Sequence, residues 1–382
     1  ALRGETFDGN KYAAAALERG CAVAVVDNPS CVADDRYVLV PDALEALQQL
    51  AAHHRKVWGK PVIQITGTNG KTTTKELLSA VLSKRYNVLY TQGNLNNHIG
   101  VPLTLLAMDH STEFGVVEMG ASACGEIALL ASIAQPNYGI LTNIGRSHLE
   151  GFGGVEGIRR GKGELFDFLN ATGGRAFVPA DDNVLSEMAA ERENMAVEYF
   201  AFATSNGVEH QLEGDYNLKN IAAAMSIGRY FDVDENRIRH AIATYTPTNN
   251  RSQRTVTDRN TLIVDCYNAN PSSMRASLES FLSERSELPR VCILGDMLEL
   301  GEWSAEEHRS IVELIAAADF ERIWLVGKHF TEAATTIANN PRVSCFASRE
   351  QVAERLETDP IEGALVLVKG SHSIGLEKLI PL

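Results

Sequence analysis

Short apolar, β-rich runs alternate with helical patterns along almost the whole chain, and this alternation constrains the fold more than any other feature. Strands that alternate with helices form parallel sheets whose faces are covered by those helices. The chain has 382 residues, which exceeds what one hydrophobic core usually holds. The sequence therefore predicts an α/β protein with more than one sheet.

The alternating runs fall into three series, separated by two polar segments. The first series has strands at 21–27 and 37–40 and helices around 12–19 and 42–52. The segment 53–61 is polar and contains Gly and Pro, so it is interpreted as a linker. The second series has strands at 62–66, 87–90, 114–119, 138–143 and 175–179, and helices at 122–134, 155–169 and 216–231. After the breaker-rich segment 245–253, the third series has strands at 261–265, 290–296, 322–327 and 364–370.

These series predict three domains: a small N-terminal α/β domain at 1–56, a central domain with a mostly parallel sheet at 57–246, and a C-terminal doubly wound, Rossmann-like domain at 247–382. The chain does not begin with Met and opens near what reads as the end of a strand. We therefore expect the N-terminal domain to be truncated.

Charge and hydropathy restrict the possible partners. Forty-nine acidic residues against 35 Lys plus Arg give a net charge of -14, which argues against broad binding of nucleic acid or anionic membranes. No run approaches the ~18 apolar residues of a membrane span, and the first residues are too polar for a signal peptide. The six cysteines are scattered without CxxC pairs and are predicted to be buried thiols. A cytoplasmic location is expected.

The stretch ITGTNGKTTTKELL (65–78) carries the strongest chemical signal. Gly67 and Gly70 enclose only two residues before Lys71, two fewer than the common phosphate-binding loop has. An apolar strand nevertheless runs into Gly67, and a helix begins after Gly70, so backbone N–H groups and the helix dipole converge on an anion site. Lys71 can reach phosphates and Thr72 offers a hydroxyl to Mg²⁺. A nucleotide site is favoured over a plain β–α turn with a solvated lysine.

Other polar residues follow strands of the second series, and each also has a plainer interpretation. Glu118 ends an apolar strand that is expected beside the strand of the phosphate-binding loop, where it either holds a cation or is exposed. His148 lies in a polar loop, and on the residues alone an ordinary loop histidine is favoured. Lys162 reads as a solvated helix lysine. Asn217 and Asn220 share a helix face and could pair with a purine edge, although N-capping is the favoured interpretation of Asn217.

The third series shows polar residues at several strand ends. Arg251 lies at the second junction, where its guanidinium suits phosphate or the surface equally well. Three strand ends of one domain carry polar side chains, which favours a site at the carboxyl edge of that sheet. The residues are Asp265, Asn268, Asn270, Asp296 and Lys369.

Taken together, the sequence blocks closely resemble those of the ATP-dependent Mur ligases of peptidoglycan synthesis, over essentially the whole chain. The blocks are TGTNGKTT, GNLNNHIGVPLTLL, VVEMGAS, TNIGRSHLEGFGG, KGELF, NNRSQ, DCYNANPSSM and LGDMLELGEWSAEEH. Within the family they are most similar to members that add D-alanyl-D-alanine to UDP-N-acetylmuramoyl-tripeptide through an acyl phosphate. The short loop is a trait of this family. The resemblance implies ATP and Mg²⁺ as cofactors, those two substrates as partners, no nucleic acid or membrane insertion, and a monomer.

The resemblance also implies a role for each matching position. The residues implied around the ATP phosphates are Gly67, Thr68, Asn69, Gly70, Lys71, Thr72 and Thr73. Those implied to hold two Mg²⁺ ions are Thr72, Glu118, His148 and, if carbamylated, Lys162. Arg251 is implied to contact phosphate, Asn217 and Asn220 to lie on the adenine side, and Asp265 to lie where the third domain approaches the nucleotide. Those implied to contact the UDP-sugar peptide are Asn96 and Asn97. Those implied either to face the incoming dipeptide or to help close the cleft are Asn268, Asn270, Asp296 and Lys369. The implied catalytic residues are Lys71, Lys162, His148 and Arg251, and the three domains would bind the UDP-sugar peptide, ATP and the dipeptide in that order.

The chain departs from the family pattern in three places. The family's uridine-binding Asp-Ser-Arg block is absent, the stretch before Gly214 is short, and His372 stands where Arg is usual. Two other functions remain as alternatives. One is another amide ligase of the superfamily, either adding a single amino acid or extending folates with glutamate. The other is a nucleotide-binding regulator without ligase activity.

Overall fold

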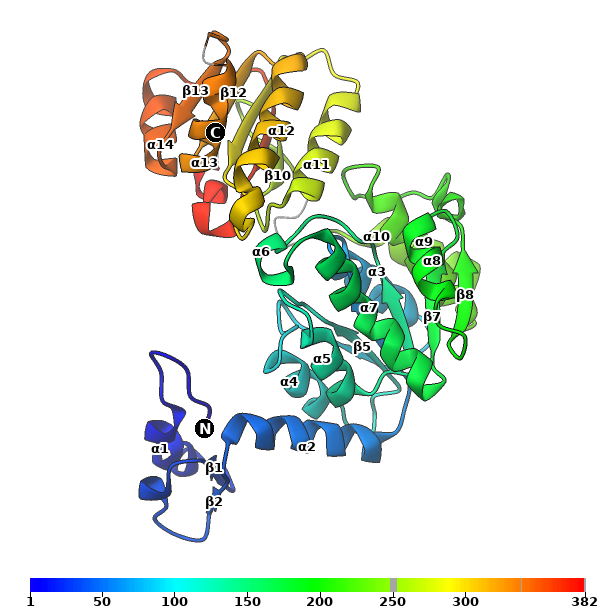
Figure 1. Cartoon of the computed structure of the whole chain (residues 1–382). Helices are drawn as coiled ribbons and strands as arrows, with labels where there is room; N and C mark the ends of the chain where they lie inside the picture. The colour runs from blue at the N-terminus through cyan, green and yellow to red at the C-terminus, as the bar shows by residue number, and fades with distance from the viewer. Residues whose placement is uncertain (248–252, 338, 381–382) are drawn as a thin grey trace.

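The computed structural model describes residues 1–247, 253–337 and 339–380. Their strands form one two-stranded and two six-stranded sheets, each part of a separate α/β unit (Figure 1). The predicted fold class, α/β with three domains, is confirmed. No helix formed by the described residues is both long and apolar enough to cross a membrane.

The N-terminal unit is small. Strands β1 (Ala24–Val26) and β2 (Tyr37–Leu39) pair in parallel, and helix α1 (Ala13–Glu18) packs on them. The buried apolar residues of this unit form a short cluster centred on Leu17 and Val26. So small a core leaves the unit dependent on what it is attached to.

Helix α2 (Ala43–Trp58) joins this unit to the central one, and it shows that the predicted linker at 53–61 is wrong. Its N-terminus is capped by Asp42, which accepts from the Glu45 N–H, and it ends at Gly59 with a φ of 68°. Residues 53–58 are helical because Arg55 is buried and donates to the Ala134 carbonyl at 3.0 Å. The polar residues of this segment therefore belong to a helix that packs on the central unit. The predicted boundary at 56/57 therefore falls inside α2.

The central sheet has the strand order β4-β5-β3-β6-β7-β8, with every neighbouring pair parallel. The strands are β3 (Val62–Thr66), β4 (Val88–Tyr90), β5 (Phe114–Glu118), β6 (Tyr138–Leu141), β7 (Arg175–Pro179) and β8 (Ala196–Phe200). The helices are α3 (Lys71–Leu82), α4 (Gly100–Leu106), α5 (Glu126–Ala134), α6 (Leu149–Phe152), α7 (Val155–Thr172), α8 (Asn183–Ala190), α9 (Asn217–Tyr230) and α10 (Glu235–Thr244). Because β3 lies between β5 and β6, the chain order reverses about β3, which is where ligands of open α/β sheets bind.

Alternate residues of the central strands enter different cores. Val62 and Val117 belong to the cluster that includes residues of α4, α5 and α7, whereas Ile63 and Val116 belong to the cluster with α3 and α9. This division follows from the period-two alternation of strand side chains. The sheet is therefore buried on both faces, and only its edges and strand ends remain for function.

The C-terminal sheet has the order β13-β12-β11-β14-β10-β9, with β9 antiparallel to β10 and the remaining pairs parallel. The strands are β9 (Gln253–Val256), β10 (Thr261–Asp265), β11 (Arg290–Gly295), β12 (Arg322–Val326), β13 (Val343–Phe346) and β14 (Leu365–Lys369). The helices are α11 (Pro271–Ser283), α12 (Ser304–Ala317), α13 (Lys328–Ala333) and α14 (Arg349–Thr358).

The prediction of buried thiols is only partly right. Cys266 and Cys292 are buried, but Cys21, Cys124 and Cys345 are exposed. Cys266 and Cys292 lie at the end of β10 and within β11, whereas Cys21 and Cys124 lie outside helices and strands. The number and spacing of the cysteines alone could not distinguish buried from exposed thiols.

Candidate active site

The phosphate-binding loop connects β3 to α3, and its two glycines are required by space and by backbone conformation. Gly67 has a φ of +136°, and a Cβ there would lie 2.1 Å from the Thr142 hydroxyl oxygen. Gly70 has a φ of +79°, and a Cβ there would lie 2.5 Å from the Asn220 side-chain oxygen. Only glycine combines these conformations with such close neighbours. The short spacing therefore produces a tight turn that is packed on both sides.

The turn that follows β6 braces this loop, and the sequence analysis did not identify it. The Asn69 N–H donates to Asn143 Oδ1 at 3.0 Å, and the Thr142 hydroxyl donates to the Asn69 carbonyl at 2.6 Å. The Thr68 N–H donates to the Asn143 carbonyl at 3.0 Å. Thr142 and Asn143 directly follow β6, the strand beside β3. Their position after that strand was the sequence signal that could have identified them.

Lys71, Thr72 and Glu118 lie around the start of α3. The Lys71 ammonium donates to the Gly67 and Thr68 carbonyls at 2.9 and 3.0 Å. The Thr72 hydroxyl donates to Glu118 Oε1 at 3.2 Å, and Asn96 Nδ2 donates to the same oxygen at 2.8 Å. The predicted adjacency of the Glu118 strand to the loop strand is confirmed, since β5 pairs with β3.

The second carboxylate oxygen of Glu118 is left without a hydrogen bond. Glu118 Oε2 is buried and receives no hydrogen bond from the part of the chain that the structure describes. The Lys75 ammonium, which is also buried, lies 3.9 Å from it. The sequence analysis missed Lys75, because a lysine on the first turns of a helix usually faces solvent. A buried carboxylate oxygen beside a hydroxyl is a suitable pair of ligands for a hard cation.

His148 lies at the N-terminus of α6 with a φ of 50°, which is unusual for a residue with a side chain. Its ring contacts the carboxylate of Glu299, a C-terminal residue that also has a positive φ. Burial lowers the pKa of His148, and the Glu299 charge opposes that effect. His148 therefore faces the C-terminal domain, and its ring is paired with that domain's carboxylate.

Lys162 is buried in α7, contrary to its interpretation as a solvated lysine on the residues alone. Its ammonium donates to the Ala121 carbonyl at 3.0 Å and lies 5.1 Å from the centre of the Phe152 ring. Burial, followed by the nearby charge of Lys71, lowers the pKa of Lys162 well below its ordinary value. A lysine in such a site is favoured in its neutral, nucleophilic form.

The predicted adenine-side and sugar-peptide asparagines bond within the protein. Asn220 Nδ2 donates to Asn217 Oδ1 at 2.8 Å, and Asn220 Oδ1 accepts from the Thr74 hydroxyl at 3.1 Å. Asn217 Nδ2 donates to the Glu213 carbonyl at 2.7 Å. Asn97 Oδ1 accepts from the N–H groups of residues 99 and 100, at the start of α4. These contacts fix the asparagines in place at the edge of the site.

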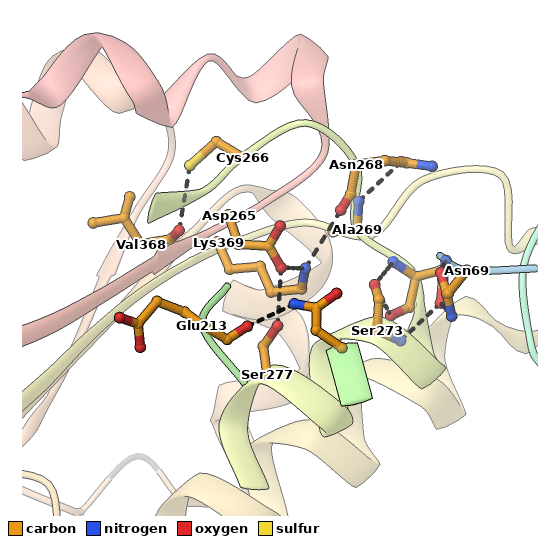
Figure 2. A network of polar contacts seen from close by, with 12 residues as sticks. Asn69, Glu213, Asp265, Cys266, Asn268, Ala269, Ser273, Ser277, Val368 and Lys369 are labelled. Carbon is orange, nitrogen blue, oxygen red and sulfur yellow. Dashed lines mark hydrogen bonds and ion pairs between the residues drawn. The ribbon is translucent and has the colours of Figure 1, made fainter. Parts of the chain in front are cut away.

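Figure 2 shows the polar network at the edge of the C-terminal sheet. Lys369 and Asp265, at the ends of β14 and β10, form an ion pair, and the Ser277 hydroxyl donates to Asp265 Oδ2 at 2.9 Å. The Lys369 ammonium also lies 3.5 Å from the Asn268 carbonyl. The expected grouping at the carboxyl edge of the sheet is therefore present for these three residues.

Asn270, Asp296 and Arg251 are placed differently. Asn270 bonds to Asn69 of the phosphate-binding loop, with its Nδ2 donating to Asn69 Oδ1 at 2.8 Å. The Asp296 carboxylate accepts from the N–H groups of His329 and Phe330 at the start of α13, at 3.0 and 2.8 Å, so the structure uses it as a helix cap. Arg251 lies outside the described residues.

A single cleft of about 1010 Å³ joins these features. Its lining includes α2, the phosphate-binding loop, the ends of β5 and β6, the start of α9, and the carboxyl edge of the C-terminal sheet. Predicted site residues in the lining are Thr68, Asn69, Gly70, Lys71, Thr72, Thr73, Asn96, Asn97, Glu118, His148, Asn217, Asn220, Asp265, Asn268 and Lys369. Lys162 lies behind the lining residue Ala121.

Comparison with known proteins identifies the family. The Mur ligase middle domain matches residues 65–222, and the Mur ligase glutamate ligase domain matches residues 250–372. The chain belongs to the Mur ligase family. Like its relatives in that family, this Mur ligase is an ATP-dependent ligase.

Individual relatives cover nearly the whole chain. The UDP-N-acetylmuramoyl-tripeptide--D-alanyl-D-alanine ligase of Bacillus subtilis is 33% identical, over 99% of this chain and 88% of that protein. A crystal structure of MurF from Acinetobacter baumannii is 30% identical with a TM-score of 0.86, over 100% of this chain and 88% of that one. The MurF ligase of Thermotoga maritima, solved in complex with ADP, is 26% identical with a TM-score of 0.84, over 100% of this chain and 92% of that one.

Proposed function

We propose that this Mur ligase adds D-alanyl-D-alanine to UDP-N-acetylmuramoyl-tripeptide, with ATP consumed through an acyl phosphate, as a cytoplasmic step of peptidoglycan precursor synthesis. The observation that carries the proposal is the single cleft, in which the phosphate-binding loop faces the carboxyl edge of the C-terminal sheet. The names of the relatives over the full chain supply the identity of the substrates. The protein is proposed to act as a monomer.

The three domains divide the ligands between them. We assign the UDP-sugar peptide to residues 1–56 with Asn96 and Asn97, ATP to 57–246, and the dipeptide to 247–382. Asn268 and Lys369 line the cleft from that last domain and support this assignment. Asn270 and Asp296 are engaged in interdomain and capping contacts, so we place them in supporting roles. Arg251 keeps its proposed contact with phosphate.

The residues present fit a magnesium ion beside the phosphates. The Thr72 hydroxyl and Glu118 Oε2, which accepts no hydrogen bond from the described residues, provide hard oxygen ligands. The described residues contain no group of three His, Cys, Asp or Glu that could hold a metal. Phosphate oxygens, His148 and a carbamate on Lys162 would have to complete the ligands. When bound, Mg²⁺ supplies positive charge that neutralises the phosphate oxygens.

The chemistry must make a carboxylate electrophilic. A carboxylate oxygen of the tripeptide attacks the γ-phosphorus of ATP, and the bond to the bridging oxygen breaks to release ADP. The dipeptide amine then attacks the acyl carbon of the resulting acyl phosphate, and phosphate leaves as the amine loses a proton. Lys71 would shift from the Gly67 and Thr68 carbonyls to the phosphates, and the backbone of the loop would orient them.

A substrate-panel assay tests this function. Purified protein with ATP and Mg²⁺ should form the amide, detected by mass spectrometry, only when UDP-muramoyl-tripeptide and D-alanyl-D-alanine are both present. Joining of a single amino acid, or of glutamate to a folate, would replace the proposal with another ligase of the superfamily. Nucleotide binding without any amide product would favour the regulator.

A further inference from the structure

The side chain of Asn69, inside the phosphate-binding loop, is bonded to the other domain. Asn270 Nδ2 donates to Asn69 Oδ1 at 2.8 Å, and Asn69 Nδ2 donates to Asn270 Oδ1 at 3.4 Å. The two residues are 201 positions apart in the chain. Both polar atoms of the Asn69 side chain are therefore directed at the C-terminal domain.

Each partner of this amide pair is fixed on its own side. Asn270 is 5% exposed and caps α11: its Oδ1 accepts from the Ser273 N–H at 2.9 Å, and its own N–H donates to the Ser273 hydroxyl at 3.1 Å. Asn69 is held by Asn143 and Thr142 of the turn after β6. The pair thus joins a helix terminus to a tight turn, and neither end can adjust freely.

Adjacent contacts reinforce the same junction. The Arg146 N–H donates to the Ser272 hydroxyl at 2.8 Å, and the Gly145 N–H donates to the Thr68 hydroxyl at 2.9 Å. A Cβ on Gly145 would lie 2.8 Å from the Ser272 hydroxyl oxygen. Three segments are therefore packed in layers: the phosphate-binding loop, the turn after β6 and the start of α11. A conformational change in the loop would displace the start of α11.

We propose that the Asn69–Asn270 amide pair is a clasp that couples docking of the C-terminal domain to the conformation of the phosphate-binding loop. The proposal rests on the proposed ligation, and in that reaction both asparagines are positioning residues. With the clasp closed, water is kept from the acyl phosphate until the dipeptide amine attacks. With the clasp broken, water attacks instead and returns the carboxylate and free phosphate, so that ATP is spent without an amide.

The first test measures phosphate released per amide formed. Asn69→Ala removes both bonds of the clasp, and Asn270→Ser removes them while keeping a residue that caps helices about as well. Each single variant should raise the ratio of phosphate to amide at least roughly threefold. The ratio of the double variant should not exceed the higher of the two single-variant ratios, because both changes remove the same interaction. Ile315→Val, a buried truncation elsewhere in the domain, should lower the melting temperature and leave the ratio unchanged.

Two results would overturn the clasp. One is an unchanged ratio in both single variants of a wild type that forms the amide. The other is a double variant whose ratio equals the product of the two single effects, which would mean that the residues act independently.

A second measurement does not depend on ligation. A non-hydrolysable ATP analogue should slow hydrogen exchange of the backbone amides at 272–276 at least roughly threefold in the wild type, and not in either variant. Equal slowing in the variants would overturn the proposal. If the wild type fails to form the amide but shows this protection, the proposed substrates are wrong and the clasp stands.

Discussion

At the scale of single residues, Lys71 is the first test of the loop. Its ammonium donates to two carbonyls of its own turn, those of Gly67 and Thr68. Lys71→Ala should lower ATP-dependent amide formation at least about a hundredfold, since it removes the positive charge next to the transferring group. The melting temperature should stay close to that of the wild type. Retained turnover would contradict the role of Lys71 in the loop.

Lys162 supports a second prediction, because its burial favours the neutral amine that can add CO₂. Lys162→Ala should lose most activity, at least about a hundredfold, and acetate or formate should restore part of it by supplying the missing negative charge. Initial rates at increasing acetate concentration measure the rescue. Lys60→Ala, which removes a half-buried lysine amine bonded to two carbonyls, is a control for nonspecific effects of the acid. A variant that acetate does not rescue would argue against a carbamate.

His308 gives a pH dependence whose sign follows from its contacts. It is fully buried: its Nδ1 lies 2.7 Å from the Ser304 carbonyl, and its Nε2 accepts from the Met297 N–H at 3.0 Å. Burial lowers the pKa of His308, with Asp296 opposing and His329 adding to the effect. Below about pH 6.5 the unfolded chain takes up a proton that the folded chain does not, so stability falls as the pH falls.

The measurement is the free energy of unfolding between pH 7.5 and 5.5, obtained from thermal melts. His308→Gln keeps an acceptor for Met297 and cannot titrate, so its free energy of unfolding should fall less on acidification, by on the order of 1 kcal/mol. A variant with the same acid sensitivity as the wild type would show that other groups, such as His148, account for it.

At the scale of elements, the sequence predicted the central strands and the edge strand β4, and missed three other edge strands. Strands β3 and β5 were predictable because every residue in them is buried and apolar residues run together. Strands β8, β9 and β13 were missed, since each lies at the edge of a sheet and is largely half-buried or exposed. An edge strand needs little apolar surface, so its sequence carries a weak signal. The last turns of α2 were missed for the opposite reason, because the buried Arg55 reads as polar.

The turn after β6 supports a prediction at this scale. Gly145→Ala would place a Cβ 2.8 Å from the Ser272 hydroxyl oxygen and 3.2 Å from a Thr68 methyl carbon. The change should slow ligation about tenfold or more by pushing the C-terminal domain away, with only about 1 kcal/mol lost in stability. Ser272→Gly removes the obstructing hydroxyl, so the double variant should ligate faster than Gly145→Ala alone. Slower ligation by the double variant would contradict this steric explanation.

At the scale of the whole molecule, sequence patterns placed residues at strand ends but could not pair them across domains. Lys71, Thr72 and Glu118 were found because adjacent parallel strands must bring their ends together. The contact of His148 with Glu299 spans 151 positions, and that of Asn69 with Asn270 spans 201. Such pairs depend on how two separate sheets dock, which no local periodicity encodes. The capping of α13 by Asp296 was not predicted either, because it depends on how α13 meets the end of β11 within the C-terminal domain.

An ion pair crosses the contact between the two large domains, and its charges can be exchanged by substitution. Arg146 of the central domain lies 2.8 Å from Glu307 Oε1 on α12, and the Glu307 side chain is only 7% exposed. Burial raises the pKa of Glu307 and Arg146 opposes this, so an ionised Glu307 depends on the arginine. Arg146→Glu would place two carboxylates together, and the domains should separate, because a buried charge without a partner is costly.

Small-angle X-ray scattering with a non-hydrolysable ATP analogue measures that separation. The radius of gyration of Arg146→Glu should exceed that of the wild type by about 1 Å or more, against roughly 21 Å for a compact chain of this length. Adding Glu307→Arg should bring it back, because the pair is restored with its charges exchanged. Arg159→Glu makes the same charge change in an ion pair within the central domain and should leave the radius unchanged. Equal radii for Arg146→Glu and the wild type would mean that the amide pair and the His148–Glu299 contact hold the domains together without this ion pair.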